Sequence, residues 1–467
     1  MATSTVALAA VWNPFVSERL VVGQWTVLLG YAVLPWAVRA ALRVVDGSGR
    51  RGALVLALCV AGVGGVNTVA LAASAMFAVL LAGIGRAPRR SCGSLVLTTA
   101  VAVGVSAGWV LPAWGAGVSV DPGSVDAFAP VADTPLGLWG SFVSGGGFWN
   151  TASHPAQRSL LLIAVLAAML AAVAIVAFVL EVLRARQWRV LVPIVGGALV
   201  VALSAMPMTR DLWTWMVTQI PGGGVLRDSQ KFLALWVIAL AVGAGLIIER
   251  LRPMCASVAG PAAAGVIGLV ILLSPQLLWG VGGRLDAEPV PEGYREAAAR
   301  LSAQPAGEVG LLPWQQYRRY DWNGDRVSLT LAPRIIDHRV LFDDSLRLRG
   351  GTVAGENPRA AAVSAELERG GSPVDALASA GVRYIAAELG AGLDVDEGSV
   401  RAAGRVIVDD PRLLVVDLGH GRETPEVGRW GALGWALTVT TFVVSITGLL
   451  VAWMRRKLPA SLLRSRP

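Results

Sequence analysis

Long apolar runs, separated by short polar stretches, dominate the pattern of hydrophobic and polar positions along the chain. A helix of about 20 apolar residues is long enough to cross the hydrocarbon core of a bilayer. This pattern is therefore typical of an α-helical polytopic membrane protein. Runs of that length predict spans over residues 20–42, 93–113, 159–180, 190–208, 231–248, 257–281 and 431–454.

The apolar stretch 53–84 is too long for one ordinary span and short for two. Gly62, Gly64 and Gly65 lie near its middle, together with the polar pair Asn67-Thr68. We expect a tight helical hairpin here, which brings the predicted total to about nine spans.

Basic residues test this hairpin, because positively charged loops lie on the cytoplasmic side of a membrane. If residues 53–84 cross twice, every basic cluster that follows a span falls on one side. The C-terminus is then cytoplasmic. The extracytoplasmic parts are the N-terminus and residues 1–19, 114–158, 209–230 and 283–429. The basic clusters are Arg39, Arg43, Arg50 and Arg51; Arg86, Arg89 and Arg90; Arg184, Arg186 and Arg189; Arg250 and Arg252; and Arg455, Arg456 and Lys457.

Composition supports the membrane assignment and explains the net charge of +8. Of the 467 residues, 54% are hydrophobic and only 15% are charged, which excludes a single soluble globule. The segment 283–428 holds 23 of the 32 acidic residues but only 17 of the 40 basic ones. The basic excess therefore belongs to the membrane part, where it reports orientation rather than nucleic-acid binding.

The acidic segment before the last span has the pattern of a small α/β domain. Asn357-Pro358 and Ser372-Pro373 each pair a capping residue with a proline at the first helical position, and Gly381 ends the second helix. We expect three regions: an incomplete transmembrane domain over 1–282, an extracytoplasmic α/β domain over 283–429, and a final span with a basic tail over 430–467. The candidate strands are 308–312, 339–342, 382–386, 406–408 and 413–416, the last two joined by the turn Asp409-Asp410-Pro411.

The sequence contains no motif for a cofactor or a metal site. The three cysteines (Cys59, Cys92, Cys255) lack paired spacing, and the three histidines (His154, His338, His420) are far apart. A phosphate-loop motif is absent, which disfavours an ATP-driven transporter. We predict no metal site, although a divalent cation at a phosphate remains compatible with the sequence.

The first candidate site is the N-terminal cluster, residues 12–25. Glu18 and Arg19 fall at the rim of the first span, with Asn13 before them and Gln24 and Trp25 after them. A carboxylate there could act as a general base toward a sugar hydroxyl if burial raised its pKa, and the polar neighbours could bind substrate. Alternatively, Glu18 and Arg19 form local ion pairs and Trp25 belongs to an interfacial aromatic belt.

The second candidate site is the glycine-rich cluster, residues 221–232, at the outer mouth of the seventh span. Arg227 and Lys231 are four residues apart on one helix face, behind a triple glycine. This arrangement suits a phosphate at the level of the lipid headgroups, and Asp228 could orient a cation or act as a base. The alternative is that Arg227 and Asp228 cap the helix and Lys231 extends to the interface.

The third candidate site is the long-loop cluster, within residues 114–158. Trp149 and His154 lie there beside acidic residues and the triple glycine 145–147. Aromatic faces beside polar groups suit carbohydrate binding, although loops also collect such residues without any role. A further aromatic run, residues 314–322, lies in the α/β segment and is either a glycan-binding or membrane-facing loop or an ordinary solvated connection.

The first two clusters also carry a family resemblance. Residues 13–20 with Gly23-Gln24-Trp25, and residues 225–232, resemble stretches of large actinobacterial membrane arabinofuranosyltransferases of the α-(1→3) type. The layout is also similar to that of YfhO-type membrane proteins, which carry a strand like residues 381–385 in an exported domain before a final span. Both families belong to the GT-C class of polytopic glycosyltransferases.

The resemblance implies a membrane glycosyltransferase that takes a sugar from a polyprenyl-phosphate donor and transfers it, with inversion, to a cell-envelope glycan or glycolipid. Arg227, Lys231 and Arg19 would hold the phosphate, and Glu18 or Asp228 would serve catalysis. Family members normally carry a catalytic acidic residue in the loop between the first two spans, and this chain begins after that point. We therefore expect either upstream helices missing from this chain or a non-catalytic relative.

Two other functions stay open. One is a non-enzymatic envelope-assembly or lipid-phosphate-binding protein that keeps the phosphate site. The other is a transporter or flippase, for which charged residues near span centres would be expected, and the spans contain few. The donor sugar, the acceptor, the linkage and the oligomeric state are not encoded in any motif that we recognise.

Overall fold

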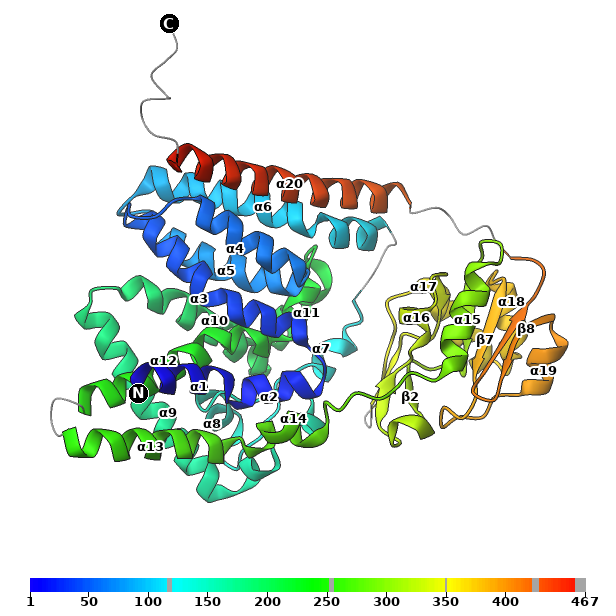
Figure 1. The fold of residues 1–467 in the computed structure, drawn as a ribbon, viewed down its shortest axis with the longest axis horizontal. Coiled ribbons are helices and arrows are strands. Elements are labelled where there is room, and N and C mark those ends of the chain that lie inside the picture. The colour runs from blue at the N-terminus through cyan, green and yellow to red at the C-terminus, as the bar shows by residue number, and fades with distance from the viewer. Residues whose placement is uncertain (116–119, 252–255, 349–350, 422–427, 458–467) are drawn as a thin grey trace, which may run out of the picture. The chain divides into compact units, whose positions relative to one another are not determined.

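The computed structural model describes residues 1–467 except 116–119, 252–255, 349–350, 422–427 and 458–467. Arg252 and Cys255 lie outside the described residues, as do the side chains of Arg456 and Lys457. The chain forms two compact units. One is a helical bundle of residues 1–113, 128–285 and the C-terminal helix, and the other is an α/β unit of residues 114–127 and 286–428 (Figure 1).

The helical bundle contains long helices, short helices and 3₁₀ turns. Two of the 3₁₀ turns, η5 (Gly223–Leu226) and η6 (Ser229–Leu233), carry the glycine-rich cluster. The helices are α1 (Ala2–Val11), α2 (Pro14–Val21), α3 (Trp25–Val45), α4 (Gly52–Val63), α5 (Val66–Ala82), α6 (Pro88–Gly115), α8 (Gly137–Val143), α9 (Leu161–Arg184), α10 (Leu191–Ala205), α11 (Arg210–Gln219), α12 (Ala234–Leu251), α13 (Ala256–Leu273), α14 (Leu278–Gly283) and α20 (Arg429–Lys457).

The predicted apolar runs form helices, which confirms a helical membrane protein. Among the described residues, six helices are long and apolar enough to cross a bilayer, and seven if one bent pair counts as a span. That pair, Gly260–Leu273 and Pro275–Gly283, bends by 78°. The total of about nine spans stays a prediction, because α4 and α5 are shorter than a full span.

The apolar stretch 53–84 forms the expected pair of helices. Gly64 and Gly65 separate α4 from α5, and Gly65 has a φ of +82°, a conformation that favours glycine. A Cβ atom on Gly64 would lie 2.4 Å from Oγ1 of Thr68. Thr68 in turn donates a hydrogen bond to the carbonyl of Thr26 at 2.7 Å, which ties α5 to α3. The predicted helical hairpin is confirmed.

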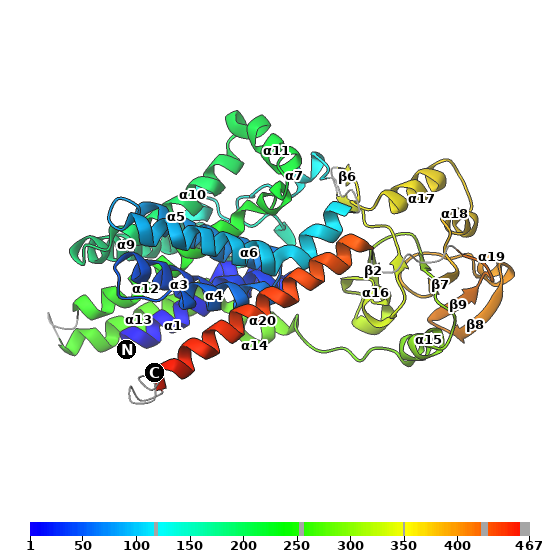
Figure 2. The same ribbon diagram turned by 90° about the horizontal axis from the view of Figure 1, so that it is seen from above.

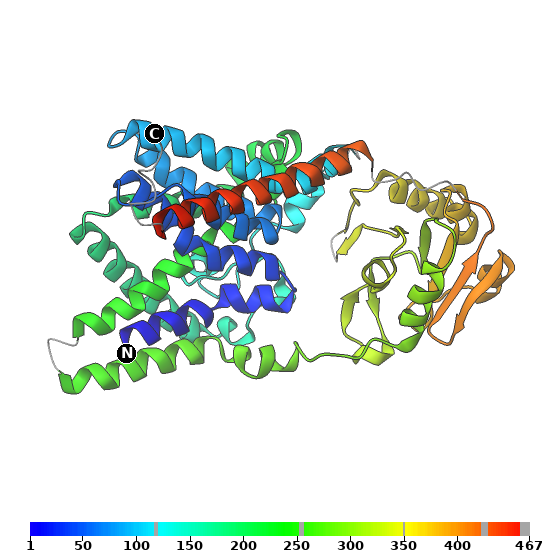
Figure 3. The ribbon, with the colours of Figure 1, turned by 45° about the horizontal axis from the view of Figure 1, so that its top comes forward.

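The N-terminal residues 1–19, which the sequence predicts to be extracytoplasmic, are largely helical, and the side of the membrane on which they lie stays a prediction. Residues 2–11 form α1, which packs against α12 and α13 within the bundle (Figure 3). Small side chains allow such close approach between helices. The same close approach occurs between α12 and α9, where a Cβ atom on Gly243 would lie only 2.0 Å from the carbonyl oxygen of Ala174. The C-terminal helix α20 crosses α6 at an angle and also contacts α4 (Figure 2). At the crossing, Thr438 donates to the carbonyl of Gly104 in α6 at 3.0 Å.

The α/β unit has a central five-stranded sheet in the order β4-β1-β7-β9-β8. The strands β4, β1 and β7 are parallel, and β9 and β8 run antiparallel as a hairpin. Apolar clusters cover both faces of the sheet. The sheet strands are β1 (Val309–Leu312), β4 (Val340–Leu341), β7 (Tyr384–Glu388), β8 (Arg405–Asp410) and β9 (Leu413–Asp417).

Outside the central sheet, two short hairpins and several helices complete this unit. The hairpins pair β2 (Tyr317–Arg319) with β3 (Val327–Leu329) and β5 (Leu346–Leu348) with β6 (Gly351–Val353). The helices are α7 (Gly123–Ala127), α15 (Glu292–Ser302), α16 (Ala332–Ile335), α17 (Pro358–Glu368), α18 (Pro373–Ser379) and α19 (Glu397–Ala402). The five predicted strands and the two Pro-initiated helices are confirmed, with Asn357 and Ser372 as their caps. The two hairpins were not predicted.

Candidate functional site

The structure brings the three candidate clusters of the sequence together inside the helical bundle. Arg19 of α2 donates to Oε1 of Gln230 in η6. Gln230 donates in turn to the carbonyl of Gly146, in the long-loop cluster, at 3.0 Å. One glutamine therefore links the N-terminal cluster, the glycine-rich cluster and the long-loop cluster.

Helix α2 positions Glu18 and Arg19, and Asn13 starts this helix. The Asn13 side chain accepts from the backbone N–H of Val16 at 3.0 Å and donates to the carbonyl of Ala9 at 3.0 Å. These bonds make Asn13 a helix cap, with Pro14 at the first helical position. Glu18 and Arg19 are both fully buried. Burying two charged groups is costly unless other groups compensate their charge.

A buried ion pair that the sequence reasoning missed lies beside Glu18. Nε of Arg158 is 2.6 Å from Oδ2 of Asp133, and a second guanidinium nitrogen reaches the other oxygen at 3.1 Å. Both side chains are almost completely buried. The available signal was the position of Arg158 directly before an apolar run, where a charge is unusual.

The charge on Glu18 follows from its neighbours. Burial raises the pKa of the Glu18 carboxyl well above its usual range, and the Asp133 carboxylate raises this pKa further. Burial alone would also raise the pKa of Asp133, but the Arg158 guanidinium outweighs it and lowers that pKa. These environments favour the protonated form of Glu18 and the ionised form of Asp133. Neither oxygen of Glu18 accepts a hydrogen bond from a described residue.

The triple glycine 145–147 makes room for this ion pair. A Cβ atom on Gly146 would lie 2.2 Å from Oδ2 of Asp133 and 2.6 Å from a nitrogen of Arg158. Gly145 and Gly147 have φ values of +81° and +86°, which favour glycine. The sequence analysis predicted no structural role for this glycine-rich loop. In the structure, its backbone passes directly over the ion pair of Asp133 and Arg158.

Lys231 is buried in η6 and points to the hairpin of α4 and α5. Its ammonium group donates to Oδ1 of Asn67 at 2.8 Å and to the carbonyl of Val225. Asp228 lies near enough to interact electrostatically with both Lys231 and Arg19, and its Oδ1 has no hydrogen-bond partner among the described residues. Asn67, which the sequence placed in the hairpin without a role, is thus part of the site.

Aromatic rings connect Arg227 to Arg19. The Arg227 guanidinium lies 4.6 Å from the Phe128 ring, and the Phe128 ring centre is 4.6 Å from that of Trp149. Phe148 continues the row, 5.1 Å from Trp149 and 4.9 Å from the Arg19 guanidinium. Such cation–π contacts stabilise buried cations. His154 contributes indirectly, because its Nε2 lies 2.7 Å from the carbonyl of Phe148.

Gln24 and Trp25 are the remaining predicted site residues of the N-terminal cluster. Gln24 precedes α3, and its buried Oε1 accepts no hydrogen bond from a described residue. Trp25 is 61% exposed, as expected for an interfacial tryptophan. The positions of Asn13 and Trp25 are thus explained without a substrate, whereas the unpartnered oxygen of Gln24 leaves its predicted substrate contact a prediction.

Arg19 and Lys231 are two buried cations that interact with the same carboxylate. Asp133 pairs with Arg158, and Asp228 lies near enough to act electrostatically on both Arg19 and Lys231. Buried charges of one sign attract an oppositely charged ligand. Arg227 lies beside them and is only partly buried.

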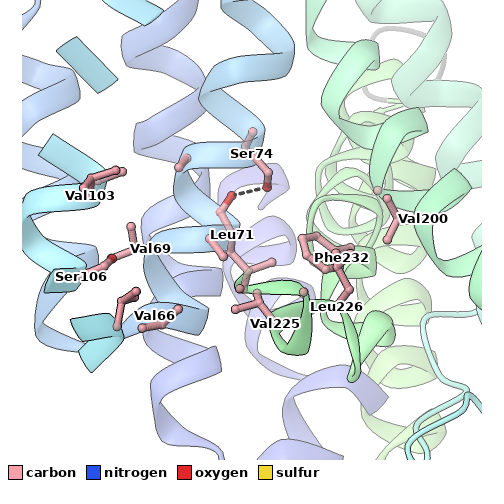
Figure 4. Close-up of a pocket in the computed structure, with 18 of the residues that line it drawn as sticks. Val66, Val69, Leu71, Ser74, Val103, Ser106, Val200, Val225, Leu226 and Phe232 are labelled. Atoms are coloured by element: carbon pink, nitrogen blue, oxygen red, sulfur yellow. Dashed lines mark hydrogen bonds between the residues drawn. The ribbon is translucent and has the colours of Figure 1, made fainter. Parts of the chain in front are cut away.

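An apolar cavity of about 770 Å³ adjoins this cation cluster (Figure 4). Val225 and Leu226 of η5 line it, together with Val66 of α5. The carbonyl of Val225 and the side chain of Asn67, directly after Val66, both bind the Lys231 ammonium group. The cavity wall therefore passes directly into the cationic part of the site. The other walls come from α5, α6, α10 and α12.

No group of three metal-ligating side chains occurs among the residues that the structure describes.

No protein-family model matches the sequence, and no curated protein sequence is significantly similar to it. Among solved structures, the chain is similar to the cryo-EM structure of arabinofuranosyltransferase AftD from Mycobacteria, with a TM-score of 0.50 and 14% sequence identity. The match covers 89% of this chain but only 31% of that protein, so this chain spans less than a third of its length. At this identity the likeness concerns the fold alone.

Proposed function

We propose that this protein is a membrane glycosyltransferase that transfers a sugar from a polyprenyl-phosphate donor to a cell-envelope glycan or glycolipid. One observation carries the proposal: the buried cations Arg19 and Lys231 lie beside an apolar cavity of about 770 Å³, whose lining residue Val225 binds the Lys231 ammonium group. A polyprenyl phosphate has the same two parts, an anionic group and a long apolar chain. The fold similarity to an arabinofuranosyltransferase supports the choice of a transferase, with arabinofuranose as a candidate sugar.

The proposed roles follow from position. Lys231 and Arg227 hold the donor phosphate, and Arg19 supports them from α2. The apolar cavity accepts the first part of the prenyl chain. As the acceptor hydroxyl forms its bond to the anomeric carbon, the bond from that carbon to the phosphate oxygen breaks, and the cations stabilise the departing polyprenyl phosphate. Trp149 and His154 flank the site and remain candidates for sugar contacts.

Asp228 is the better candidate for the residue that takes the proton of the acceptor hydroxyl. It is only partly buried, and one of its carboxylate oxygens has no hydrogen-bond partner among the described residues. Glu18 is fully buried, so an acceptor hydroxyl has no exposed carboxylate oxygen to approach there. We therefore assign Glu18 a positioning role beside Asp133.

The positions of the basic clusters favour the orientation given by the sequence. The N-terminus and residues 283–429 would be extracytoplasmic and the C-terminus cytoplasmic. A plasma-membrane location with transfer on the outer side fits a lipid-linked donor, which needs no nucleotide sugar.

The test is transfer by the full chain in nanodiscs, with polyprenyl-phosphate arabinofuranose as donor and envelope glycan fragments as acceptors. Asp228→Asn should abolish transfer while donor binding persists, and Lys231→Met should weaken donor binding. Arg89→Met is the matched control, because it removes an exposed cation outside the site. Wild-type protein that neither transfers sugar nor binds the donor would overturn the proposal.

A second candidate is a lipid-phosphate-binding protein without transferase activity. The full burial of Glu18, the carboxyl group that the sequence favoured as base, supports this candidate. It predicts the same loss of binding in Lys231→Met but no transfer by the wild-type protein with any donor. The transfer assay thus separates the two functions.

A further inference from the structure

The α/β unit has a cavity of its own, about 280 Å³ in volume, that the proposed transferase function does not use. It is formed by the segments that follow two adjacent parallel strands, β1 and β7. Trp314 comes from the first segment, and Asp394 and Asp396 come from the second. Ligands of α/β sheets commonly bind at the carboxyl ends of parallel strands, where such loops converge.

The wall of this cavity is held in place by hydrogen bonds. The indole N–H of Trp314 donates to Oγ of Ser364 in α17 at 2.9 Å, which fixes the ring. The loop after β7 is anchored at Leu389, whose N–H donates to the carbonyl of Arg412 at 2.8 Å, and at Ala391, whose carbonyl accepts from Arg319 at 3.2 Å. A site that is ordered before binding loses less conformational entropy when a ligand enters.

The polar groups of the cavity suit hydroxyl groups. Asp396 accepts from the N–H and the hydroxyl of Ser399 and keeps further lone pairs. Asp394 is exposed and is within the same lining, as is the hydroxyl of Ser372. Two carboxylates disfavour phosphates and acidic sugars, because like charges repel. An indole beside hydrogen-bond acceptors is the combination that binds a sugar, whose ring has apolar C–H faces and hydroxyl edges.

We propose that this cavity binds one neutral sugar residue of a glycan, with Trp314 against its apolar face and Asp394 and Asp396 accepting from its hydroxyls. The volume lies at the lower end of ligand pockets, which fits a single residue rather than a longer oligosaccharide. The site would bring a glycan to the protein through a part of the chain outside the proposed donor-phosphate site. It does not depend on the proposed transferase activity.

The experiment uses the full chain in nanodiscs and neutral methyl glycosides (arabinofuranoside, mannopyranoside and glucopyranoside) as probes, with binding measured by saturation-transfer NMR. We expect at least one glycoside to bind, Trp314→Ala to weaken it roughly tenfold or more, and Asp394→Asn to weaken it less. Trp322→Ala is the matched control, because Trp322 stacks on Tyr320 at 4.9 Å and does not line the cavity.

Thermal unfolding of each variant shows whether it is folded, and Trp314→Phe provides a milder change that keeps an aromatic ring. The proposal is overturned if no glycoside binds, if Trp314→Ala and Trp322→Ala weaken binding equally, or if binding is lost when divalent cations are chelated. The Lys231→Met variant should bind glycosides like the wild type. A failure of this proposal is therefore distinguishable from a failure of the transferase proposal.

Discussion

Both units of the protein bury a glutamate, but the two carboxyl groups differ in their hydrogen bonding. In the α/β unit, the fully buried Glu388 accepts hydrogen bonds from Tyr294, Tyr320 and Thr330, each at 3.0 Å, and pairs with Arg318. Both oxygens of this carboxylate are satisfied, and one guanidinium balances its charge. In the helical bundle, neither oxygen of the buried Glu18 accepts a hydrogen bond from a basic side chain or a backbone N–H of the described residues, and the buried Arg19 and Lys231 interact with the same carboxylate, that of Asp228.

This difference separates structural from functional polar groups. A satisfied and neutral network stabilises one conformation and leaves nothing for a ligand to bind. A network with excess charge and unused hydrogen-bonding groups costs stability, and such sites commonly serve binding or catalysis. We therefore expect substitutions in the Glu388 network to affect folding, and substitutions around Lys231 to affect ligand binding.

The largest effect is expected for Glu388→Ala. This change leaves a buried guanidinium and three hydroxyls without their acceptor, and breaking a buried ion pair costs about 3–5 kcal/mol. We expect the α/β unit to unfold at lower temperature, which limited proteolysis of the full chain during heating would detect. Asp409→Ala is the control, since its pairing with Arg401 is exposed, and should change little. An unchanged melting profile in Glu388→Ala would show that this network is not structural.

The next effect concerns Lys231. A hydrogen bond to a charged group contributes about 1.5–3 kcal/mol, so Lys231→Met should weaken polyprenyl-phosphate binding by about 10–150-fold. Binding of the uncharged polyprenol, measured in parallel, should change far less, because the apolar cavity is intact. Equal losses for both lipids would mean that Lys231 supports the fold rather than the phosphate.

The elements of the α/β unit were predictable because their signals are local. Asn357-Pro358, Ser372-Pro373 and the turn at 409–411 each specify a boundary within a few residues. In the bundle, Gly64 and Gly65 marked the hairpin for the same reason. The hairpins β2–β3 and β5–β6 were missed because their strands are only three residues long and lack a clear alternation.

The candidate site was predictable only in part, because its central contacts join distant segments. Charged residues beside apolar runs identified Glu18, Arg19, Arg227 and Lys231. The Gln230 link between Arg19 and Gly146 spans 211 residues in one direction and 84 in the other, and no sequence pattern encodes it. The structure buries Glu18 beside Asp133, and this changes the proposed role of Glu18 from general base to positioning residue. The contact depends on how the long loop packs, which no local sequence pattern shows.

A smaller effect should appear in the pH dependence of stability. The folded-state pKa of Glu18 is raised, so between the unfolded value of about 4.3 and that raised value the folded protein holds one more proton. Stability then falls as pH rises, by up to about 1.4 kcal/mol per pH unit. Glu18→Gln removes this dependence, so the variant should gain stability over the wild type as pH increases.

Thermal unfolding between pH 5 and 8 would measure this difference. Asp133 does not interfere there, because its lowered pKa gives a stabilising contribution that is lost only as pH falls below its unfolded range. A wild-type protein whose melting temperature follows that of Glu18→Gln at every pH would show that Glu18 is ionised in the folded state.

The smallest effect distinguishes the cap from the ligand site at Asn13. As a cap of α2, Asn13 should lose about 1 kcal/mol of stability on change to alanine, whereas Asn13→Asp keeps the accepting oxygen and should lose less. Because Asn13 makes hydrogen bonds to backbone groups of its own segment, polyprenyl-phosphate affinity should change less than in Lys231→Met. If Asn13→Ala keeps its melting temperature but loses donor affinity, then Asn13 contacts substrate, as the sequence first indicated, and the charged cluster extends to the start of α2.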